Sequence, residues 1–256
     1  VQGEGRHTGI NSIFFFFFGC NYLCGGQLAA DEYEGTDYEK QTQGMANGLA
    51  NGDEEGEWVC DTIDEWMDDS SYSVEEIYER FEDEGWTEAI DDGAHLILTG
   101  GEPMVQQDEL SDLVSYFEEQ GHDPFVEVET NGSIYPDEDL REHVDQYNIS
   151  PKLTNAGMRK DVVYHPENMR RFAQLNEMEG VNADLKIVVN DKSDWEEVRD
   201  DYVEQDWFPK ENIFLMPAGL NEEKLGLSDE DVAELSVENN LNYSDRLQIR
   251  VWGEVT

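Results

Sequence analysis

The sequence predicts an α/β fold built around a parallel sheet. Short apolar segments typical of strands alternate along the chain with amphipathic segments typical of helices. Repeated strand–helix–strand units imply parallel strands joined by right-handed crossovers. The motifs described below come directly after predicted strands, where α/β folds place their sites. With 256 residues, of which 38% are hydrophobic, the chain can bury a full core, so we expect a single domain over residues 1–256.

The individual elements follow from this alternation. The first strand, over residues 12–18, is apolar on both faces, as strands of parallel barrels are. Later apolar runs predict strands at residues 95–98, 125–130, 185–189, 213–216 and 247–251. Amphipathic periodicity predicts helices near residues 74–85, 108–120, 136–144, 194–203 and 229–238. Residues 25–59 are rich in Gly, Asp, Glu, Asn and Gln without convincing periodicity, so we expect an irregular acidic insertion there.

The chain is strongly acidic along its whole length. It carries 61 Asp and Glu against 16 Lys and Arg, which gives a formal net charge of -45. A uniform acidic coat around an apolar core fits a surface that stays hydrated in concentrated salt, so we expect a halophilic protein of a salt-rich cytoplasm. An acidic mimic of nucleic acid is the alternative, which the enzyme-like core pattern disfavours. Direct nucleic-acid binding is disfavoured as well, because no basic patch could neutralise phosphates.

Neither a membrane span nor a secretory signal is predicted. No stretch of 18 apolar residues occurs, and the apolar run at residues 13–18 has no charged segment or cleavage site before it. Three cysteines without an even framework indicate a reducing compartment. The chain does not begin with Met, so we expect a few residues before Val1.

The three cysteines are the most informative residues. Cys20 and Cys24 lie in one short segment, and Cys60 follows after a long interval. Three thiolates can hold a four-iron cluster that leaves one iron open to a small molecule, whereas closed clusters use four protein ligands. This pattern predicts redox or radical chemistry. The alternative is three buried, unreactive thiols.

Further motifs resemble the radical S-adenosylmethionine (SAM) enzymes, and among them the 7-carboxy-7-deazaguanine synthase family. The cysteines and Gly100-Gly101-Glu102-Pro103 are typical of the whole superfamily, whereas Gln2-Gly3-Glu4-Gly5 and Ser150-Pro151-Lys152 narrow the resemblance to the synthase. The other matching segments are Cys60-Asp61-Thr62, Glu129-Thr130-Asn131-Gly132, Leu185-Lys186 and Leu215-Met216-Pro217. The resemblance implies a partial TIM-like barrel of parallel strands with outer helices, the radical SAM core.

The resemblance also implies roles for individual residues. Cys20, Cys24 and Cys60 would hold a 4Fe-4S cluster, and Thr62 would help to hold a magnesium ion (Mg2+). SAM would contact Gly100, Gly101, Glu102, Asn131, Ser150, Pro151, Lys152 and Met216. The substrate would contact Val1, Gln2, Gly3, Glu4, Thr99 and Glu129. Plain structural alternatives are an ordinary turn at the glycine pair, a helix cap at Glu129 and Asn131, a solvated acid at Glu102 and a strand exit at residues 150–152.

The implied activity is that of a radical SAM carbon–nitrogen lyase. SAM would be cleaved to methionine and a 5′-deoxyadenosyl radical, which abstracts hydrogen from 6-carboxy-5,6,7,8-tetrahydropterin, whose ring then contracts to 7-carboxy-7-deazaguanine with loss of ammonia. We expect ferredoxin or flavodoxin as the electron donor, and a homodimer. Two alternatives remain open: an activase that installs a glycyl radical in a partner protein, and a non-catalytic acidic binding protein.

The chain departs from the family pattern at three places. Relatives have two residues between the second and third cysteines, whereas residues 25–59 intervene here. The longer loop costs only about 2–3 kcal/mol of closure entropy, against on the order of 10 kcal/mol from metal–thiolate binding. Phe16 stands where relatives have a substrate-binding Arg, so either Arg6 or another cation reaches the substrate, or the substrate is held differently. Gln248 stands where the family often has His, and the chain ends in Gly253-Glu254-Val255-Thr256 rather than in Pro.

Overall fold

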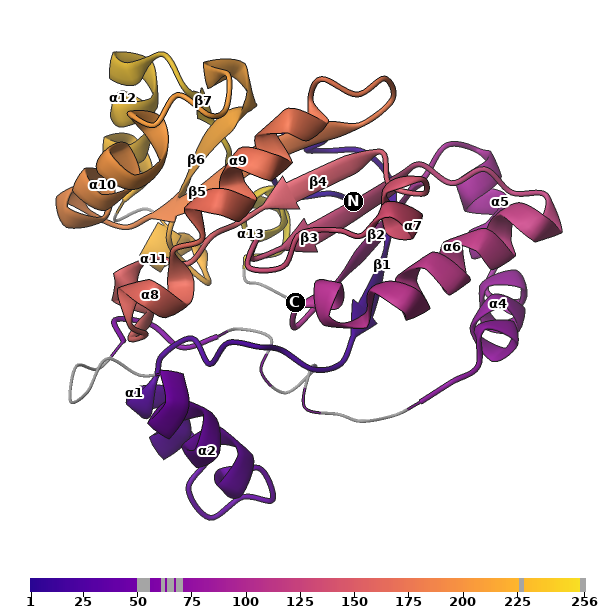
Figure 1. Ribbon diagram of the computed structural model, residues 1–256, viewed down its shortest axis with the longest axis horizontal. Coiled ribbons are helices and arrows are strands. Elements are labelled where there is room, and N and C mark those ends of the chain that lie inside the picture. The colour runs from indigo at the N-terminus through magenta and orange to yellow at the C-terminus, as the bar shows by residue number, and fades with distance from the viewer. Residues whose placement is uncertain (50–55, 61–62, 64–66, 68–70, 226–227, 254–256) are drawn as a thin grey trace.

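The computed structural model describes residues 1–49, 56–60, 63, 67, 71–225 and 228–253. Its centre is a seven-stranded sheet in which every pair of neighbours is parallel and follows chain order (Figure 1). The strands are β1 Ser12–Phe17, β2 His95–Gly100, β3 Val126–Thr130, β4 Gln146–Ile149, β5 Asn182–Val189, β6 Ile213–Pro217 and β7 Asn242–Tyr243. This is the predicted α/β fold, and it is consistent with a partial TIM-like radical SAM barrel.

Helices join most of the strands. They are α1 Gln27–Glu32, α2 Glu39–Leu49, α4 Val74–Asp83, α5 Trp86–Asp91, α6 Gln107–Gln120, α7 Glu138–Arg141, α8 Lys160–Val163, α9 Pro166–Leu175, α10 Lys192–Val198, α11 Glu222–Leu225, α12 Asp229–Asn239 and α13 Leu247–Trp252. Local sequence sets several ends. Ser73 and Glu76 form a capping box at the start of α4, and Gly121 ends α6 in the left-handed conformation at φ 99°. No described helix is long and apolar enough to cross a membrane.

The two faces of the sheet differ in chemistry. Alternate strand residues such as Leu98, Val128 and Leu185 belong to the main hydrophobic core, which also contains Phe117 of α6 and Phe172 of α9. The residues between them form the inner face of the sheet, listed here from β3 to β5 as Glu127, Glu129, Gln146, Asn148, Asp184 and Lys186. All except Glu129 are buried, so this sheet encloses an interior of charged and amide groups.

Strand β1 corrects one prediction. Residues 12–18 were expected to be apolar on two buried faces, but Phe14 and Phe16 are 38% and 49% exposed. Phe14 is in register with Ile97 and Phe16 with Thr99, which places both rings on the inner face. Phe17, on the other face, joins the core. Because β1 is an end strand, its inner face has a neighbour on one side only among the described strands.

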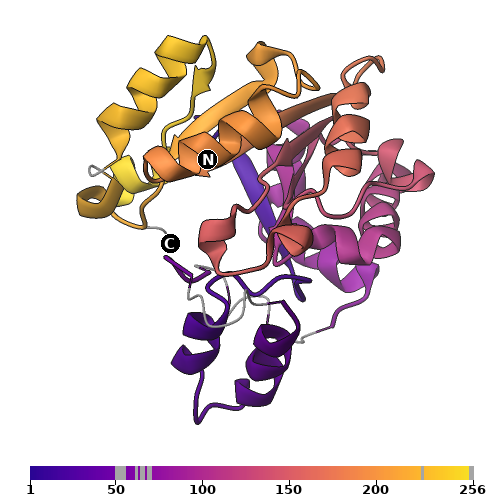
Figure 2. The ribbon, with the colours of Figure 1, turned by 60° about the vertical axis from the view of Figure 1, so that its left-hand side comes forward.

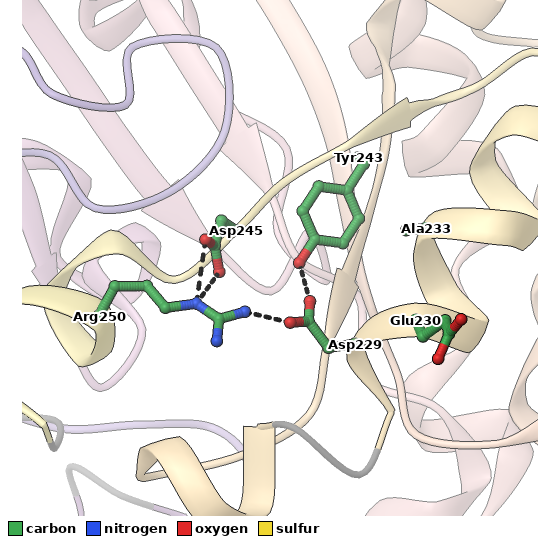
Figure 3. Close-up of a pocket in the computed structure, with 6 residues that line it drawn as sticks. All are labelled: Asp229, Glu230, Ala233, Tyr243, Asp245 and Arg250. Atoms are coloured by element: carbon green, nitrogen blue, oxygen red, sulfur yellow. Dashed lines mark hydrogen bonds and ion pairs between the residues drawn. The ribbon is translucent and has the colours of Figure 1, made fainter.

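The predicted strand at residues 247–251 is wrong, because this segment forms helix α13. The alternation of Leu247, Ile249 and Val251 imitates a strand, yet only Ile249 is fully buried. Arg250 holds the helix in place through ion pairs with Asp245 and Asp229 (Figure 3). The last strand is instead the two-residue β7, and Tyr243 on it also bonds to Asp229. None of the predicted site residues lines the pocket drawn in Figure 3.

Other differences concern polar or small-residue segments. Strand β4 and helices α5 and α9 were not predicted, and the helix expected at residues 136–144 is only the four-residue α7. The insertion at residues 25–59 is not wholly irregular, because it contains α1 and α2, which lie beside each other and below the sheet in Figures 1 and 2. Small residues make this packing possible: Ala29, Ala30 and Ala46 are buried against Leu23. The described part of the insertion therefore forms a small helical projection with an apolar cluster of its own.

Candidate functional site

The structure brings the three cysteines together despite their separation in sequence. Cys20 and Cys24 lie in the loop that follows β1, and the chain returns from the insertion so that the Cys60 amide donates a 3.2 Å hydrogen bond to the Cys24 carbonyl. All three pack against the apolar cluster formed by Tyr22 and its neighbours. Cys24 is buried, and Cys20 and Cys60 are partly exposed. The insertion therefore does not separate Cys60 from the other two.

Three glycines explain how the chain returns to this point. The Gly56 amide donates to the Gly25 carbonyl at 3.3 Å, and the Gly25 amide donates to the Ala156 carbonyl at 2.8 Å. A Cβ atom on Gly56 would lie 2.7 Å from the Gly25 Cα atom, and one on Gly157 would lie 2.6 Å from the Gly56 nitrogen. Three backbone segments can cross this closely only without side chains. The crossing fixes both ends of the insertion next to the cysteines.

Burial keeps the Cys20 thiol protonated in the absence of a metal. Burial raises the pKa of this thiol to about 12, and the nearby Glu102 and Cys60 add to the effect, whereas Lys152 opposes it. A thiolate is the form that binds metal, and metal binding releases the proton. The fit to an iron–sulfur cluster therefore rests on the convergence of three thiols, and binding of the cluster would displace the proton that burial retains on Cys20.

Glu102 connects the end of β2 to the end of β3. Its buried carboxylate accepts hydrogen bonds from Thr130 Oγ1 at 2.7 Å, the Asn131 amide at 2.6 Å and the Met104 amide at 3.1 Å. Burial nevertheless raises the pKa of Glu102 to about 7. The solvated acid considered as an alternative is therefore wrong for this residue.

Asn131 extends this connection to the cysteine loop. Its side-chain Nδ2 donates to Asn21 Oδ1 at 3.0 Å, and Asn21 Nδ2 donates to Ser133 Oγ at 2.8 Å. Asn21 lies between Cys20 and Cys24, so these bonds fix the orientation of the loop that carries both thiols. Asn21 was not among the predicted site residues, although its position between two cysteines could have indicated a role in this loop.

The glycine pair after β2 serves a close backbone crossing. Gly100 has φ 122°, and a Cβ atom there would lie 2.1 Å from the Phe17 carbonyl oxygen. The Gly101 amide donates to that oxygen at 3.2 Å, and the Glu102 amide donates to the Gly19 carbonyl at 3.0 Å. Gly100 is thus needed to bring β2 against the start of the cysteine loop, which is more than an ordinary turn requires.

The remaining predicted SAM contacts lie at the same edge of the sheet. The Ser150 amide donates to the Thr130 carbonyl at 2.7 Å, which brings the ends of β3 and β4 together. Pro151 is buried, and Lys152 is partly exposed, with its charge felt by both Cys20 and Glu102. Met216 is buried near the end of β6. These motifs therefore lie at the carboxyl ends of the parallel strands, the same edge of the sheet from which the cysteine loop leaves β1.

A second group of predicted residues meets inside the sheet. Lys186 Nζ lies 2.9 Å from both Glu4 Oε2 and Glu129 Oε2, and Gln2 Nε2 donates to Glu129 Oε1 at 3.0 Å. Burial opposes the charge of Lys186, but the two carboxylates outweigh it and raise its pKa. Burial raises the pKa of Glu129, and the positive charge of Lys186 offsets part of this rise. Lys186 belongs to the matching segment Leu185-Lys186, but no role was predicted for it.

The C-terminal helix completes this network at Glu4. Arg246 Nε and Gln248 Nε2 donate to Glu4 Oε1 at 3.0 and 2.8 Å. Although burial disfavours the charge of Glu4, Lys186 and Arg246 hold its pKa well below the ordinary range. Gly3 lies directly against the Gln248 side chain, which would have to shift to admit a Cβ atom there. Gln248, which replaces the common family His, is thus part of the support of Glu4.

Arg6 is already engaged elsewhere. Its guanidinium makes two 2.7 Å bonds to the buried carboxylate of Asp184, near the start of β5, and lies over the ring of Phe214. This bidentate geometry uses the donors that a substrate carboxylate would need.

The remaining predicted residues differ in their exposure. Thr99, near Phe16, is partly buried, and Val1 is 45% exposed at the start of the chain. Thr62, the predicted magnesium ligand, lies outside the described residues.

The relatives of the chain point to one family. It is 30% identical to the 7-carboxy-7-deazaguanine synthase of Pyrobaculum aerophilum over 99% of this chain and 91% of that protein. It is 24% identical to the synthase of Halobacterium salinarum and 26% identical to that of Rhodopirellula baltica, over 98% or more of this chain and 88% and 83% of those proteins. No protein-family model matches the chain. The likeness to the first of these relatives runs along nearly all of both sequences, and the chain therefore belongs to the 7-carboxy-7-deazaguanine synthase family.

Proposed function

We propose that this chain is a radical SAM lyase that converts 6-carboxy-5,6,7,8-tetrahydropterin to 7-carboxy-7-deazaguanine. The main support from the structure is the return of Cys60 to Cys20 and Cys24, beside Glu102 at the carboxyl ends of the strands. The synthases named among the relatives support the same reaction. When bound, the iron–sulfur cluster supplies the electron that cleaves SAM.

Cys20, Cys24 and Cys60 hold the cluster in this proposal, and the neighbouring strand ends position SAM. Gly100 and Gly101 leave the backbone open to close approach, and Glu102 presents a fixed carboxylate to the methionyl amino group. Asn131 bonds to both Glu102 and Asn21, and so fixes the position of this carboxylate relative to the cysteine loop. The remaining residues proposed to contact SAM are Ser150, Pro151, Lys152 and Met216.

The inner face holds the substrate in this proposal. Gln2, Glu4 and Glu129 are fixed by buried bonds, and such groups orient a polar ring without reorganising when it binds. Val1, Gly3 and Thr99 complete the proposed substrate-binding residues, and Thr62 would help to hold a magnesium ion, which would supply positive charge for the substrate carboxylate. A ferredoxin or flavodoxin delivers the electron, and the protein acts as a homodimer. The single domain includes the helical projection at residues 25–59.

Product analysis tests this function directly. The chain is reconstituted anaerobically with iron and sulfide and incubated with SAM, a low-potential reductant and the carboxytetrahydropterin. We expect 7-carboxy-7-deazaguanine, 5′-deoxyadenosine and methionine in the reaction mixture, with no deazaguanine when SAM is omitted. SAM cleavage without any deazaguanine would retain the radical chemistry and reject the proposed substrate.

Phe16→Arg should strengthen substrate binding. Phe16 lies half exposed on the inner face, and none of the three cations described there is unpaired: Arg6 contacts Asp184, and Lys186 and Arg246 contact Glu4. A new charged hydrogen bond of about 1.5–3 kcal/mol should lower the Michaelis constant for the carboxytetrahydropterin by roughly tenfold or more, with SAM cleavage unchanged.

Phe14→Arg is the matched control for this substitution. Phe14 lies on the same face, two residues nearer the start of β1, and we expect a smaller change there. Equal Michaelis constants for the wild type and Phe16→Arg would show that the substrate carboxylate is held away from this position.

The acidic surface supports a second proposal, that the chain is adapted to a salt-rich cytoplasm. At about 1 M ionic strength, screening acts over roughly 3 Å and relieves repulsion among exposed carboxylates. The melting temperature should therefore rise from dilute buffer into molar potassium chloride, and much less in sucrose of equal osmolality. A melting temperature that is independent of salt would contradict the adaptation.

A further inference from the structure

Two histidines and a glutamate meet at the end of the sheet opposite to the cysteines. His95 is the first residue of β2, Glu127 the second of β3, and His7 belongs to the N-terminal segment. Glu127 Oε1 lies 2.6 Å from His95 Nδ1 and 3.0 Å from His7 Nδ1. In the described part of the chain, this is the one group of three or more His, Cys, Asp or Glu residues whose ligand atoms all lie within 4.8 Å.

The surroundings hold this group in a defined geometry. Glu127 is buried, and its other oxygen accepts a 2.8 Å hydrogen bond from Asn148 Nδ2. Phe125 stacks on the His95 ring at 4.2 Å between centroids and meets the His7 ring edge-on at 5.3 Å. The side chains of His7 and His95 are 21% and 13% exposed, so water reaches one side of the cluster. A fixed carboxylate, an apolar wall and one open side are features of a metal site with a free coordination position.

We propose that His7 Nδ1, His95 Nδ1 and Glu127 Oε1 bind one divalent transition-metal ion, with Zn2+ as the best fit and water as the fourth ligand. Two imidazoles and one carboxylate are a known zinc ligand set, with bonds of about 2.0–2.2 Å, so neighbouring ligand atoms lie roughly 3.3 Å apart in a tetrahedral site. The two separations that involve Glu127, 2.6 and 3.0 Å, reach this value through shifts of well under about 1 Å, and the ligand atoms of all three residues lie within 4.8 Å of one another. Mg2+ and Ca2+ prefer oxygen ligands and fit two imidazoles poorly.

The site ties the N-terminal segment to the sheet. The Gln2 amide donates to the Ile10 carbonyl and the Gly9 amide to the Gln2 carbonyl, both at 2.8 Å, so residues 2–10 form a closed loop. His7 is the ligand from this loop, and the same loop carries Gln2 and Glu4 to the inner face. The ion therefore orders the segment proposed to hold the substrate, and it does so without the iron–sulfur cluster.

Zinc content measured on the full chain tests the site. The chain with its reconstituted cluster is used, so that the cysteines are occupied, and it is stripped with EDTA, equilibrated with zinc chloride in molar potassium chloride and desalted. We expect about one more zinc ion per chain in the wild type than in His95→Gln or His7→Gln. His143→Gln is the matched control, because His143 lies beside one carboxylate, Glu118, and the Ser115 hydroxyl but no second histidine, and it should retain the wild-type content. Zinc should also raise the melting temperature of the wild type and the control but of neither site variant.

Equal zinc contents in the wild type and both site variants would overturn the proposal. So would an equal rise in melting temperature with magnesium chloride, because that would reflect the acidic surface rather than two imidazoles. If His95→Gln does not fold, His7→Gln decides the question, since His7 lies outside the strands. None of these results depends on turnover, so the zinc site and the proposed reaction stand or fall separately.

Discussion

Replacing Cys60 with Ala should abolish the iron–sulfur cluster and, with it, all detectable SAM cleavage. The site then retains two thiolates, fewer than the three needed to hold a cluster with one open iron, and the sequence contains no other cysteine to replace Cys60. Cys20→Ala and Cys24→Ala should have the same effect. Iron and sulfide assays, visible absorption and the yield of 5′-deoxyadenosine measure the loss.

Val59→Ala is the matched control for the Cys60 variant. Val59 precedes Cys60 and lies against Gly25, so its truncation disturbs the same backbone crossing without removing a thiol. We expect it to retain the cluster and SAM cleavage, while circular dichroism shows both variants to be folded. Full iron content and SAM cleavage in Cys60→Ala would remove Cys60 from the site and contradict the proposed ligand set.

The sequence was sufficient for those parts of the fold in which apolar patterning and burial agree. β2, β5 and β6 were predicted because each contains an apolar run, and β3 because its apolar and polar residues alternate after Phe125. β4 was missed because it has only four residues, and its inner-face residues Gln146 and Asn148 are polar, which leaves too short an apolar pattern. α13 was taken for a strand because its apolar residues alternate, whereas its place is set by ion pairs to Asp229 and Asp245. Such tertiary contacts leave no local signal.

The candidate site shows the same division. The cysteines were predicted from their number and positions, and Glu102 and Glu129 from the resemblance of their neighbours in sequence to the family motifs. The partners of Lys186 could not be predicted this way, since Glu129 is 57 residues away and Glu4 is 182 residues away. The three glycines that close the insertion were equally hidden, because their requirement arises from a crossing of distant backbone segments.

Lys186→Met should destabilise the fold by about 3–5 kcal/mol, the usual cost of leaving a buried charge without its partner. The Lys186 side chain is 4% exposed. Its removal leaves Glu129 without the cation that it pairs with, whereas Glu4 keeps its second cation, Arg246. Denaturant unfolding at constant salt measures the loss. Lys160→Met is the matched control: Lys160 pairs with Asp201 but is 52% exposed, so we expect a change of about 0–1 kcal/mol.

A second substitution separates stability from function. Lys186→Met with Glu129→Gln removes the unpaired charge and should regain most of the lost stability, because Glu4 keeps Arg246. Turnover of the carboxytetrahydropterin should stay at least tenfold below the wild type, since Glu129, which is proposed to orient the substrate, has lost its carboxylate and the cation that fixes it. If the double variant recovers both stability and turnover, the Lys186–Glu129 pair has no role in binding the substrate.

The deficit of Lys186→Met should also shrink as the pH falls toward about 5. In the wild type, the pKa of Lys186 is raised above 10.5, so its contribution is complete below that value and is lost only as the pH rises through the folded pKa. The pKa of Glu4 is lowered from 4.5, so its contribution is present above 4.5 and is lost only in stronger acid. Both contributions are therefore constant between pH 5 and 9.

In the Lys186→Met variant, Lys186 no longer opposes the effect of burial on Glu129. The pKa of Glu129 therefore lies further above 4.5 than in the wild type. The folded variant then takes up a proton that the unfolded chain does not, and falling pH stabilises it relative to the wild type. A deficit that stays constant between pH 5 and 8 would mean that the lost stability comes from packing around Lys186 rather than from the unpaired carboxylate.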